Sequence, residues 1–222
     1  KKIILNPNLV LININYNFKR MLSDVAAFFG KYKYKYNIIF IAGMPMSATT
    51  FVKNMLGLVP GYYTRYAPMP AEIGQDITSS AFKYCPKYGF TLFKTHLNPW
   101  EENINIIREN NVKKVIVTFR DMRDVALSRY HRLLKWPKKK TEQHYMDYSK
   151  MDKEEALNHS IFIVANEYIP WMKGWLKISK QYNNFVHFCS FEMLIKDPKK
   201  EFLKILKFYE INLSEIKVSE II

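Results

Sequence analysis

Short, mostly apolar runs separated by stretches with helical spacing constrain this chain most. The runs lie at residues 38–42, 90–94, 112–119 and 185–190. Apolar strands without regular polar alternation are typical of a parallel sheet that is covered on both faces. The helical stretches supply the crossovers that parallel strands need. The sequence therefore predicts an α/β fold, a P-loop-like parallel sheet flanked by helices on both faces.

The remaining segments complete the expected layout. A weak apolar-polar alternation predicts a short strand at 9–14, and residues 62–88 are expected to be irregular apart from a short helix near 71–82. Residues 136–150 are expected to form a polar, basic loop. Trp171, Met172 and Trp175 have helical spacing and are expected in the core. Helices are expected at 18–29, 50–58, 98–110, 122–134, 153–167, 170–181 and 197–209.

Composition limits the class of protein. With 34 Lys and Arg against 20 Asp and Glu, the formal net charge is +14, which favours an anionic partner without choosing one. The two cysteines, Cys85 and Cys189, have no zinc-binding spacing, and we expect two free thiols. No apolar run approaches the ~20 residues of a membrane span. We expect a cytoplasmic domain; a lost signal or anchor ahead of Lys1 is the alternative.

The first chemical signal is the turn after the first apolar run. It reads G-M-P-M-S-A-T-T-F over residues 43–51 and leads into a helix. Such a turn presents backbone N–H groups to an anion at a helix N-terminus, and Ser47, Thr49 and Thr50 add hydroxyl donors. The Walker motif is absent. The alternative is a plain strand-to-helix turn whose hydroxyls cap the helix.

Two further signals lie where later strands are expected to end. Lys94 and His96 share a strand face, so His96 could take a proton while Lys94 neutralises an anionic group. Arg120 leaves the third strand, and Ser128 lies two turns into the next helix, so the pair could clamp a phosphate. The alternatives are a capping His with a surface Lys, and ion pairs that Arg120 and Arg123 form with the Asp side chains at 121 and 124.

Together these segments resemble four motifs of the sulfotransferase family, in order. The family's P-K-S-G-T-T-W is similar to P-M-S-A-T-T-F at 45–51, and its K-T-H-L-P to K-T-H-L-N-P at 94–99. Its R-N-x-x-D-V-A-x-S resembles R-D-M-R-D-V-A-L-S at 120–128. Its Y-E-D-L-x-x-D-P resembles F-E-M-L-I-K-D-P at 191–198. The resemblance extends from residue 38 to about residue 210.

The resemblance implies an enzyme that moves a sulfuryl group from 3′-phosphoadenosine 5′-phosphosulfate to an acceptor hydroxyl or amine, with no metal. His96 would be the base that activates the acceptor, and Lys94 would contact the transferring group. The loop backbone and Thr hydroxyls would hold the 5′-phosphosulfate, Phe51 would stack on adenine, and Arg120 with Ser128 would bind the 3′-phosphate. The implied donor site comprises Pro45, Met46, Ser47, Ala48, Thr49, Thr50, Phe51, Arg120 and Ser128.

Several departures from the family pattern raise an alternative. The loop Lys is Met46, the loop Gly is Ala48, and the Tyr of the fourth motif is Phe191. The family's late R-K-G-x-x-G does not appear before Ile222, so residues 1–222 are expected to be a single domain that lacks its C-terminal segment or fills that role elsewhere. Candidates for that role are Arg123, Arg129 and Arg132.

The functional hypotheses follow from these departures. An active sulfotransferase with a small-molecule or glycan acceptor is the leading hypothesis, with Lys94 or Lys53 compensating for Met46. A catalytically degenerate module that binds the nucleotide or an anionic glycan is the alternative. A kinase is disfavoured by the missing Walker Lys, and a nucleic-acid binder rests on charge alone. No specific nucleic-acid partner is expected, and the sequence predicts no oligomeric state or acceptor.

Overall fold

The protein is built on one sheet of five parallel strands. The computed structural model describes residues 7–65, 75–83, 85–135 and 146–222. The strand order is β2-β3-β1-β4-β5, and every neighbouring pair is parallel. The strands are β1 (Ile38–Ala42), β2 (Tyr62–Arg65), β3 (Phe90–Thr95), β4 (Val115–Phe119) and β5 (Val186–Ser190).

Helices cover both faces of this sheet, as predicted. Adjacent β1 residues Phe40 and Ile41 are fully buried in two separate apolar clusters, because successive strand side chains point to opposite faces. One cluster includes residues of α3 (Glu101–Glu109) and α6 (Ile169–Gln181). The other includes residues of α2 (Thr49–Leu56), α8 (Pro198–Phe208) and α9 (Glu215–Ile221). The predicted fold class is therefore confirmed.

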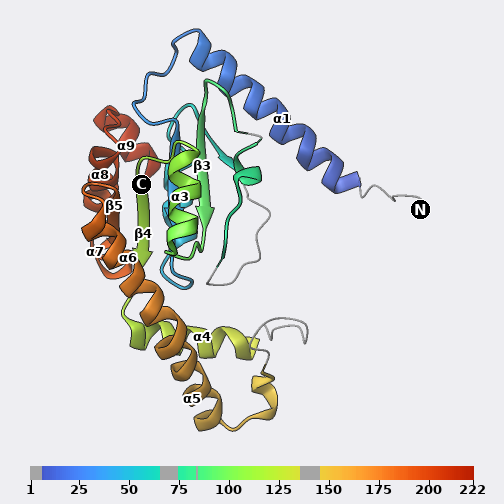
Figure 1. Cartoon of the computed structure of the whole chain (residues 1–222), viewed down its shortest axis with the longest axis vertical. Coiled ribbons are helices and arrows are strands. Elements are labelled where there is room, and N and C mark those ends of the chain that lie inside the picture. The colour runs from blue at the N-terminus through green and yellow to red at the C-terminus, as the bar shows by residue number, and fades with distance from the viewer. Residues whose placement is uncertain (1–6, 66–74, 84, 136–145) are drawn as a thin grey trace.

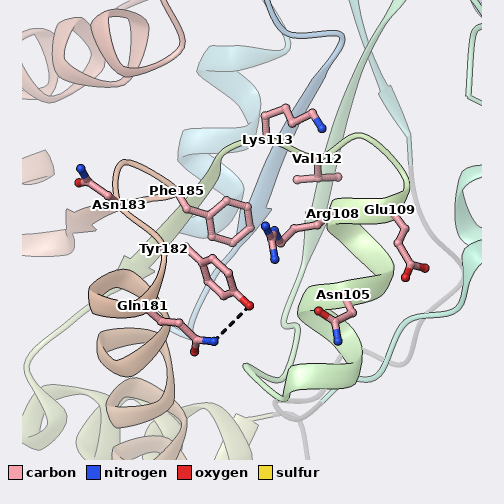
Figure 2. A pocket seen from close by; sticks show the side chains of 9 residues that line it. All are labelled: Asn105, Arg108, Glu109, Val112, Lys113, Gln181, Tyr182, Asn183 and Phe185. Atoms are coloured by element: carbon pink, nitrogen blue, oxygen red, sulfur yellow. Dashed lines mark hydrogen bonds between the residues drawn. The ribbon is translucent and has the colours of Figure 1, made fainter.

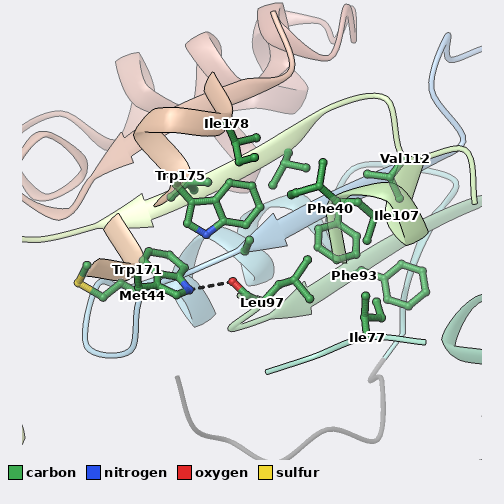
Figure 3. Close-up of a cluster of buried hydrophobic side chains, with 14 of the residues drawn as sticks. Phe40, Met44, Ile77, Phe93, Leu97, Ile107, Val112, Trp171, Trp175 and Ile178 are labelled. Atoms are coloured by element: carbon green, nitrogen blue, oxygen red, sulfur yellow. Dashed lines mark hydrogen bonds between the residues drawn. The ribbon is translucent and has the colours of Figure 1, made fainter. Parts of the chain in front are cut away.

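The first cluster holds the two tryptophans that the sequence analysis placed in the core. Trp171 and Trp175 are almost completely buried, with Met172 packed against the cluster. The Trp171 indole N–H donates to the Leu97 carbonyl at 2.8 Å (Figure 3). This bond ties α6 to the segment that follows β3. The prediction of two free cysteines is also confirmed, since neither Cys85 nor Cys189 is bridged.

A second layer of helices extends the molecule past the carboxyl ends of the strands. The β4 arrow in Figure 1 points toward α4 (Met122–Lys135), and α5 (Lys153–Ile163) packs beside α4. A short 3-10 turn, η2 (Tyr148–Lys150), precedes α5 within the loop that was predicted to be basic; residues 136–145 of that loop lie outside the described residues. The three segments predicted to carry the site, which follow β1, β3 and β4, all lie at this end of the sheet.

Two predictions near the N-terminal half were wrong. Residues 9–14 are not a strand, because they belong to helix α1 (Pro7–Phe28), which starts with a proline whose fixed φ suits a first helical turn. Residues 62–65 are not irregular, because they form edge strand β2, whose Tyr, Thr and Arg give no apolar run. Of the helix predicted near 71–82, residues 71–74 lie outside the described part, and the rest contains the 3-10 helix η1 (Ser79–Phe82).

Three helical features were not predicted. Between α5 and α6 the chain does not break, because a π-helical segment, η3 (Val164–Tyr168), joins them. A π segment shifts the hydrogen-bond pattern, and here it precedes Pro170, which has no N–H to donate. Helices α7 (Phe191–Lys196) and α9 are short and were missed as well. That residues 1–222 make up a single domain stays a prediction.

Candidate active site

The turn between β1 and α2 has the backbone form of an anion-binding loop. Met46 and Ala48 both adopt left-handed backbone angles, with φ of 68° and 58°. Residues that alternate in this way turn successive N–H groups toward one concave side. Within the described part of the chain, no hydrogen-bond partner is found for the N–H groups of residues 46–50. These groups are therefore available to a negatively charged ligand at the N-terminus of α2.

Two of the predicted hydroxyl donors face inward rather than toward such a ligand. Ser47 and Thr49 are buried, and their Oγ atoms lie 2.7 and 2.9 Å from Oγ1 of Thr118 on β4. Both also donate to the Met44 carbonyl, at 2.6 and 3.1 Å. Their hydroxyls hold the loop against β4, whereas Thr50 is exposed at the start of α2. Of the three predicted hydroxyl donors, Thr50 is thus the one on an exposed side chain.

Gly43 allows the loop to sit this close to β4. Its N–H donates to the Thr95 carbonyl at 3.0 Å, and the next N–H, of Met44, donates to the Thr118 carbonyl at 2.9 Å. A Cβ at Gly43 would lie 2.2 Å from the Thr49 side chain and 2.6 Å from Oγ1 of Thr118. Only glycine fits here, so the first residue of the loop is fixed by close packing rather than by an unusual φ.

Lys94 and His96 meet beside this loop. The Lys94 Nζ lies 3.3 Å from Nε2 of His96, as expected for side chains on one strand face. His96 Nδ1 forms a hydrogen bond with the Gly43 carbonyl, and the His96 backbone N–H donates to Oε1 of Gln75 at 2.8 Å. Because a carbonyl can only accept, the proton is on Nδ1 and the lone pair is on Nε2. The ring is therefore held in one tautomer with its basic nitrogen beside Lys94.

Burial and nearby positive charges lower the pKa values of both His96 and Lys94. Burial lowers the pKa of His96 from 6.5 to about 4, and the charges of Lys94 and, less strongly, Arg132 act in the same direction. The pKa of Lys94 is also lowered, first by burial and then by the charges of Lys53 and Arg132. At neutral pH His96 is consequently an uncharged base. Basic side chains from β3 and the residue after it, from α2 and from α4 therefore act on one another here: Lys94, His96, Lys53 and Arg132.

Arg120 and Ser128 are also brought together. The Arg120 Nη1 donates to the Ser128 hydroxyl at 3.0 Å, and its guanidinium lies 4.1 Å from the ring centre of Phe191. An alternative ion pair with Asp124 is present but long, at 3.4 Å. Among the described residues, Nε of Arg120 is buried without a hydrogen-bond partner. An unsatisfied buried donor of this kind is costly unless a ligand accepts from it.

The fourth motif packs against this arginine and the residue that follows it. Phe191 lies against the Arg120 guanidinium, and Oε1 of Glu192 accepts from the Asp121 N–H at 2.9 Å. Arg123, proposed as a substitute for the missing late element, is instead paired with Asp121 at 2.6 Å. The motif therefore joins the end of β5 to the end of β4.

Sequence reasoning missed the residues that hold the site together. Thr118 is two residues before Arg120, so strand alternation already put both on one face. The roles of Gln75 and of the Gly43 carbonyl had no local signal, because each acts on His96 from a distant segment. Phe51 is exposed in the first turn of α2, where a flat ligand can reach it, and Pro45 is buried.

A separate pocket lies at the opposite end of the sheet. It has a volume of about 640 Å³ and is lined by residues just ahead of β4 and β5, among them Val112 and Phe185 (Figure 2). Arg108 stacks on Tyr182 there, 4.1 Å from the ring centre. Its lining residues are all remote in the fold from the three motifs.

The described residues offer neither a metal site nor a membrane span. They contain no group of three or more His, Cys, Asp or Glu side chains arranged to bind a metal. None of the helices in this part of the chain is long and apolar enough to cross a bilayer.

Comparison with known proteins gives one family and one fold. The model of the sulfotransferase domain family matches residues 37–222. Mouse sulfotransferase SULT7A1, solved with PAP, aligns at a TM-score of 0.60 and 19% identity over 83% of this chain and 62% of that chain. A sulfotransferase from Alicyclobacillus acidocaldarius aligns at a TM-score of 0.52 and 13% identity, over 84% of this chain and 89% of that chain. No curated protein matches the chain, which spans less than two thirds of the mouse protein.

Proposed function

Because this chain belongs to the sulfotransferase domain family, we propose that it transfers a sulfuryl group from 3′-phosphoadenosine 5′-phosphosulfate to a hydroxyl or amine of a small-molecule or glycan acceptor. The observation that carries the proposal is the position of His96. The Nε2 of this buried base accepts a hydrogen bond from Lys94, and its other nitrogen is bonded to Gly43, the first residue of the anion-binding loop.

The chain's own residues fit both charged ends of this donor. The N–H groups of residues 46–50, with the Thr50 hydroxyl, match the 5′-phosphosulfate, and Phe51 can stack on the adenine. Arg120 and Ser128 match the 3′-phosphate, which would also accept from the Arg120 Nε that lacks a partner among the described residues. Two anion sites on adjacent strand ends therefore select a nucleotide with phosphates at both its 5′ and 3′ positions.

His96 acts on the acceptor in this proposal. The acceptor oxygen or nitrogen bonds to sulfur as the bond from sulfur to the bridging oxygen breaks, and the acceptor proton passes to Nε2 of His96. Adenosine 3′,5′-bisphosphate leaves with the bridging oxygen and its charge. Lys94 shifts its donated hydrogen bond from Nε2 to a sulfuryl oxygen, where its charge favours the transition state.

Met46 is the observation that favours a second candidate function, a module that binds the nucleotide or an anionic glycan without turnover. A cation at this loop position would lie near the leaving oxygen, and methionine supplies none. We propose that Lys94 or Lys53 compensates, because the charges of Lys53 and Arg132 both act on Lys94. If no cation compensates, the chain is a module that binds the nucleotide or an anionic glycan without turnover.

Turnover with the labelled donor and a panel of phenols, amines and desulfated glycans tests the proposal. His96→Ala should lower the rate by roughly 10²–10⁴-fold, because a general base contributes that much, and should leave the affinity for adenosine 3′,5′-bisphosphate unchanged. His187→Ala is the matched control, since the pKa of His187 is likewise lowered by burial but this residue lies on β5. Near-normal turnover by the His96 variant would contradict the assignment.

A further inference from the structure

Helix α1 carries an apolar face that the rest of the described protein leaves uncovered. Six large apolar side chains on it or directly after it are exposed, and Phe28 and Phe29 are the most exposed, at 73% and 78%. Figure 1 shows α1 along the outer side of the sheet, away from α8 and α9. These six residues, named here the outer face of α1, are Phe18, Met21, Leu22, Val25, Phe28 and Phe29.

The opposite side of α1 is fixed to the protein by polar contacts. The Ser23 hydroxyl accepts from the Phe90 N–H at 3.0 Å and donates to the Gly61 carbonyl at 3.1 Å. The Asp24 carboxylate accepts from the N–H groups of Tyr88 and Gly89, at 2.7 and 3.0 Å. Residues advance about 100° each around a helix, so Ser23 lies nearly opposite the centre of the outer face and Asp24 lies beside its edge. Its exposure follows from how the helix is docked.

The charges around the outer face are positive. Lys19 is exposed on α1 and lies one turn before Leu22, Arg20 lies on the other side of the helix, and the exposed Lys31 and Lys33 follow its end. A Cβ at Gly30 would lie 3.5 Å from Cε of Lys33, so this lysine folds back toward the helix. The single carboxylate of α1, on Asp24, is already bound by two N–H groups. The outer face therefore has basic neighbours without a free acid on the same helix.

We propose that the outer face of α1 binds the surface of an anionic membrane and holds the domain there with α1 parallel to the lipid plane. An apolar helix face beside Lys and Arg is the pattern of interfacial helices, whose apolar side enters the lipid while the cations attract acidic headgroups. A second copy of the chain is the poorer partner, because each copy has a net charge of +14 and would bring basic neighbours together. This inference is independent of the proposed sulfuryl transfer.

Co-flotation with vesicles tests the proposal, using the full chain with phosphatidylcholine alone and with phosphatidylcholine mixed with phosphatidylserine. Wild type should float with the acidic vesicles at low ionic strength and much less at high ionic strength. Phe28→Glu should lower the partition coefficient at least about tenfold, since it removes a large apolar group and adds a repelled charge. Ile216→Glu is the matched control, because Ile216 on α9 is 74% exposed, close to the value for Phe28.

A second variant keeps the test independent of folding defects. Lys31→Glu with Lys33→Glu leaves the apolar residues in place and should also release the protein from acidic vesicles. Thermal unfolding of each variant shows whether it is folded. Three results would overturn the proposal: no flotation of wild type, equal binding to neutral and acidic vesicles, or a dimer in light scattering that Phe28→Glu dissociates.

Discussion

Removing the charge of Lys94 should raise the pKa of His96. The Lys94 Nζ lies 3.3 Å from the His96 ring nitrogen, and the pKa of His96 is about 4. Even at the dielectric constant of bulk water, a unit charge at that separation opposes protonation by about 1.3 kcal/mol, or about one pKa unit. Burial, the larger cause, is unchanged by the substitution. Lys94→Met should therefore move the His96 pKa from about 4 to about 5.

The same change should alter how stability depends on pH. The pKa of His96 in the folded protein lies below its ordinary value of 6.5, so the unfolded chain takes up a proton first as pH falls. The stability linked to neutral His96 is therefore complete above pH 6.5 and is lost between 6.5 and about 4. Lys94→Met should reduce this loss by about 1.3 kcal/mol, the equivalent of one pKa unit.

Histidine NMR titration measures the pKa directly, with the His96 signal assigned from a His96→Asn variant. Urea unfolding at neutral and acidic pH measures the linked change in stability. Lys177→Met is the control, since Lys177 is exposed on α6 and should leave the His96 titration unchanged. A His96 midpoint near 6.5 in wild type, or the same midpoint in wild type and Lys94→Met, would refute the argument.

Three further substitutions test the loop. Ala48→Gly should raise the free energy of unfolding by about 1 kcal/mol, because alanine is strained in a left-handed conformation; Ala126→Gly, inside α4, should lower it by about as much, and urea unfolding checks both signs. Gly43→Ala should abolish donor binding in calorimetry, because its Cβ would lie 2.2 Å from the Thr49 side chain. Met46→Lys should change single-turnover transfer only modestly if another cation already acts; a large gain would favour the inactive module.

The buried half of the fold could be predicted from sequence, whereas its edges could not. The β1 strand stood out because every one of its residues is buried, which demands an uninterrupted apolar run. The β2 strand lies at the sheet edge and contains Tyr, Thr and Arg, so nothing separated it from a loop. Over a window as short as residues 9–14, the apolar pattern fits a strand and a helix equally well. These residues are helical because they belong to the longer helix α1.

In the candidate site, contacts between residues close in sequence were predictable, whereas contacts between distant segments were not. Lys94 with His96 was predictable because the strand period places both on one face. Arg120 with Ser128 was predictable because Ser128 lies about two turns into the helix that follows Arg120. The inward turn of the Ser47 hydroxyl was not, because its partner Thr118 is 71 residues away. The effect of Arg132 on Lys94 and His96 depends on how α4 packs past the sheet, which no local pattern encodes.

Calorimetric titration with adenosine 3′,5′-bisphosphate and with 5′-AMP tests the central claim most directly. Arg120 and Ser128, which lie together at the end of β4, are proposed to bind the 3′-phosphate, so the nucleotide that carries one should bind more tightly. A charge-assisted contact of this kind contributes roughly 1.5–3 kcal/mol, which is about ten- to a hundredfold or more in affinity. Arg120→Met should remove most of that difference. Equal affinity of the wild-type protein for the two nucleotides would contradict the assignment of this chain as a user of 3′-phosphoadenosine 5′-phosphosulfate.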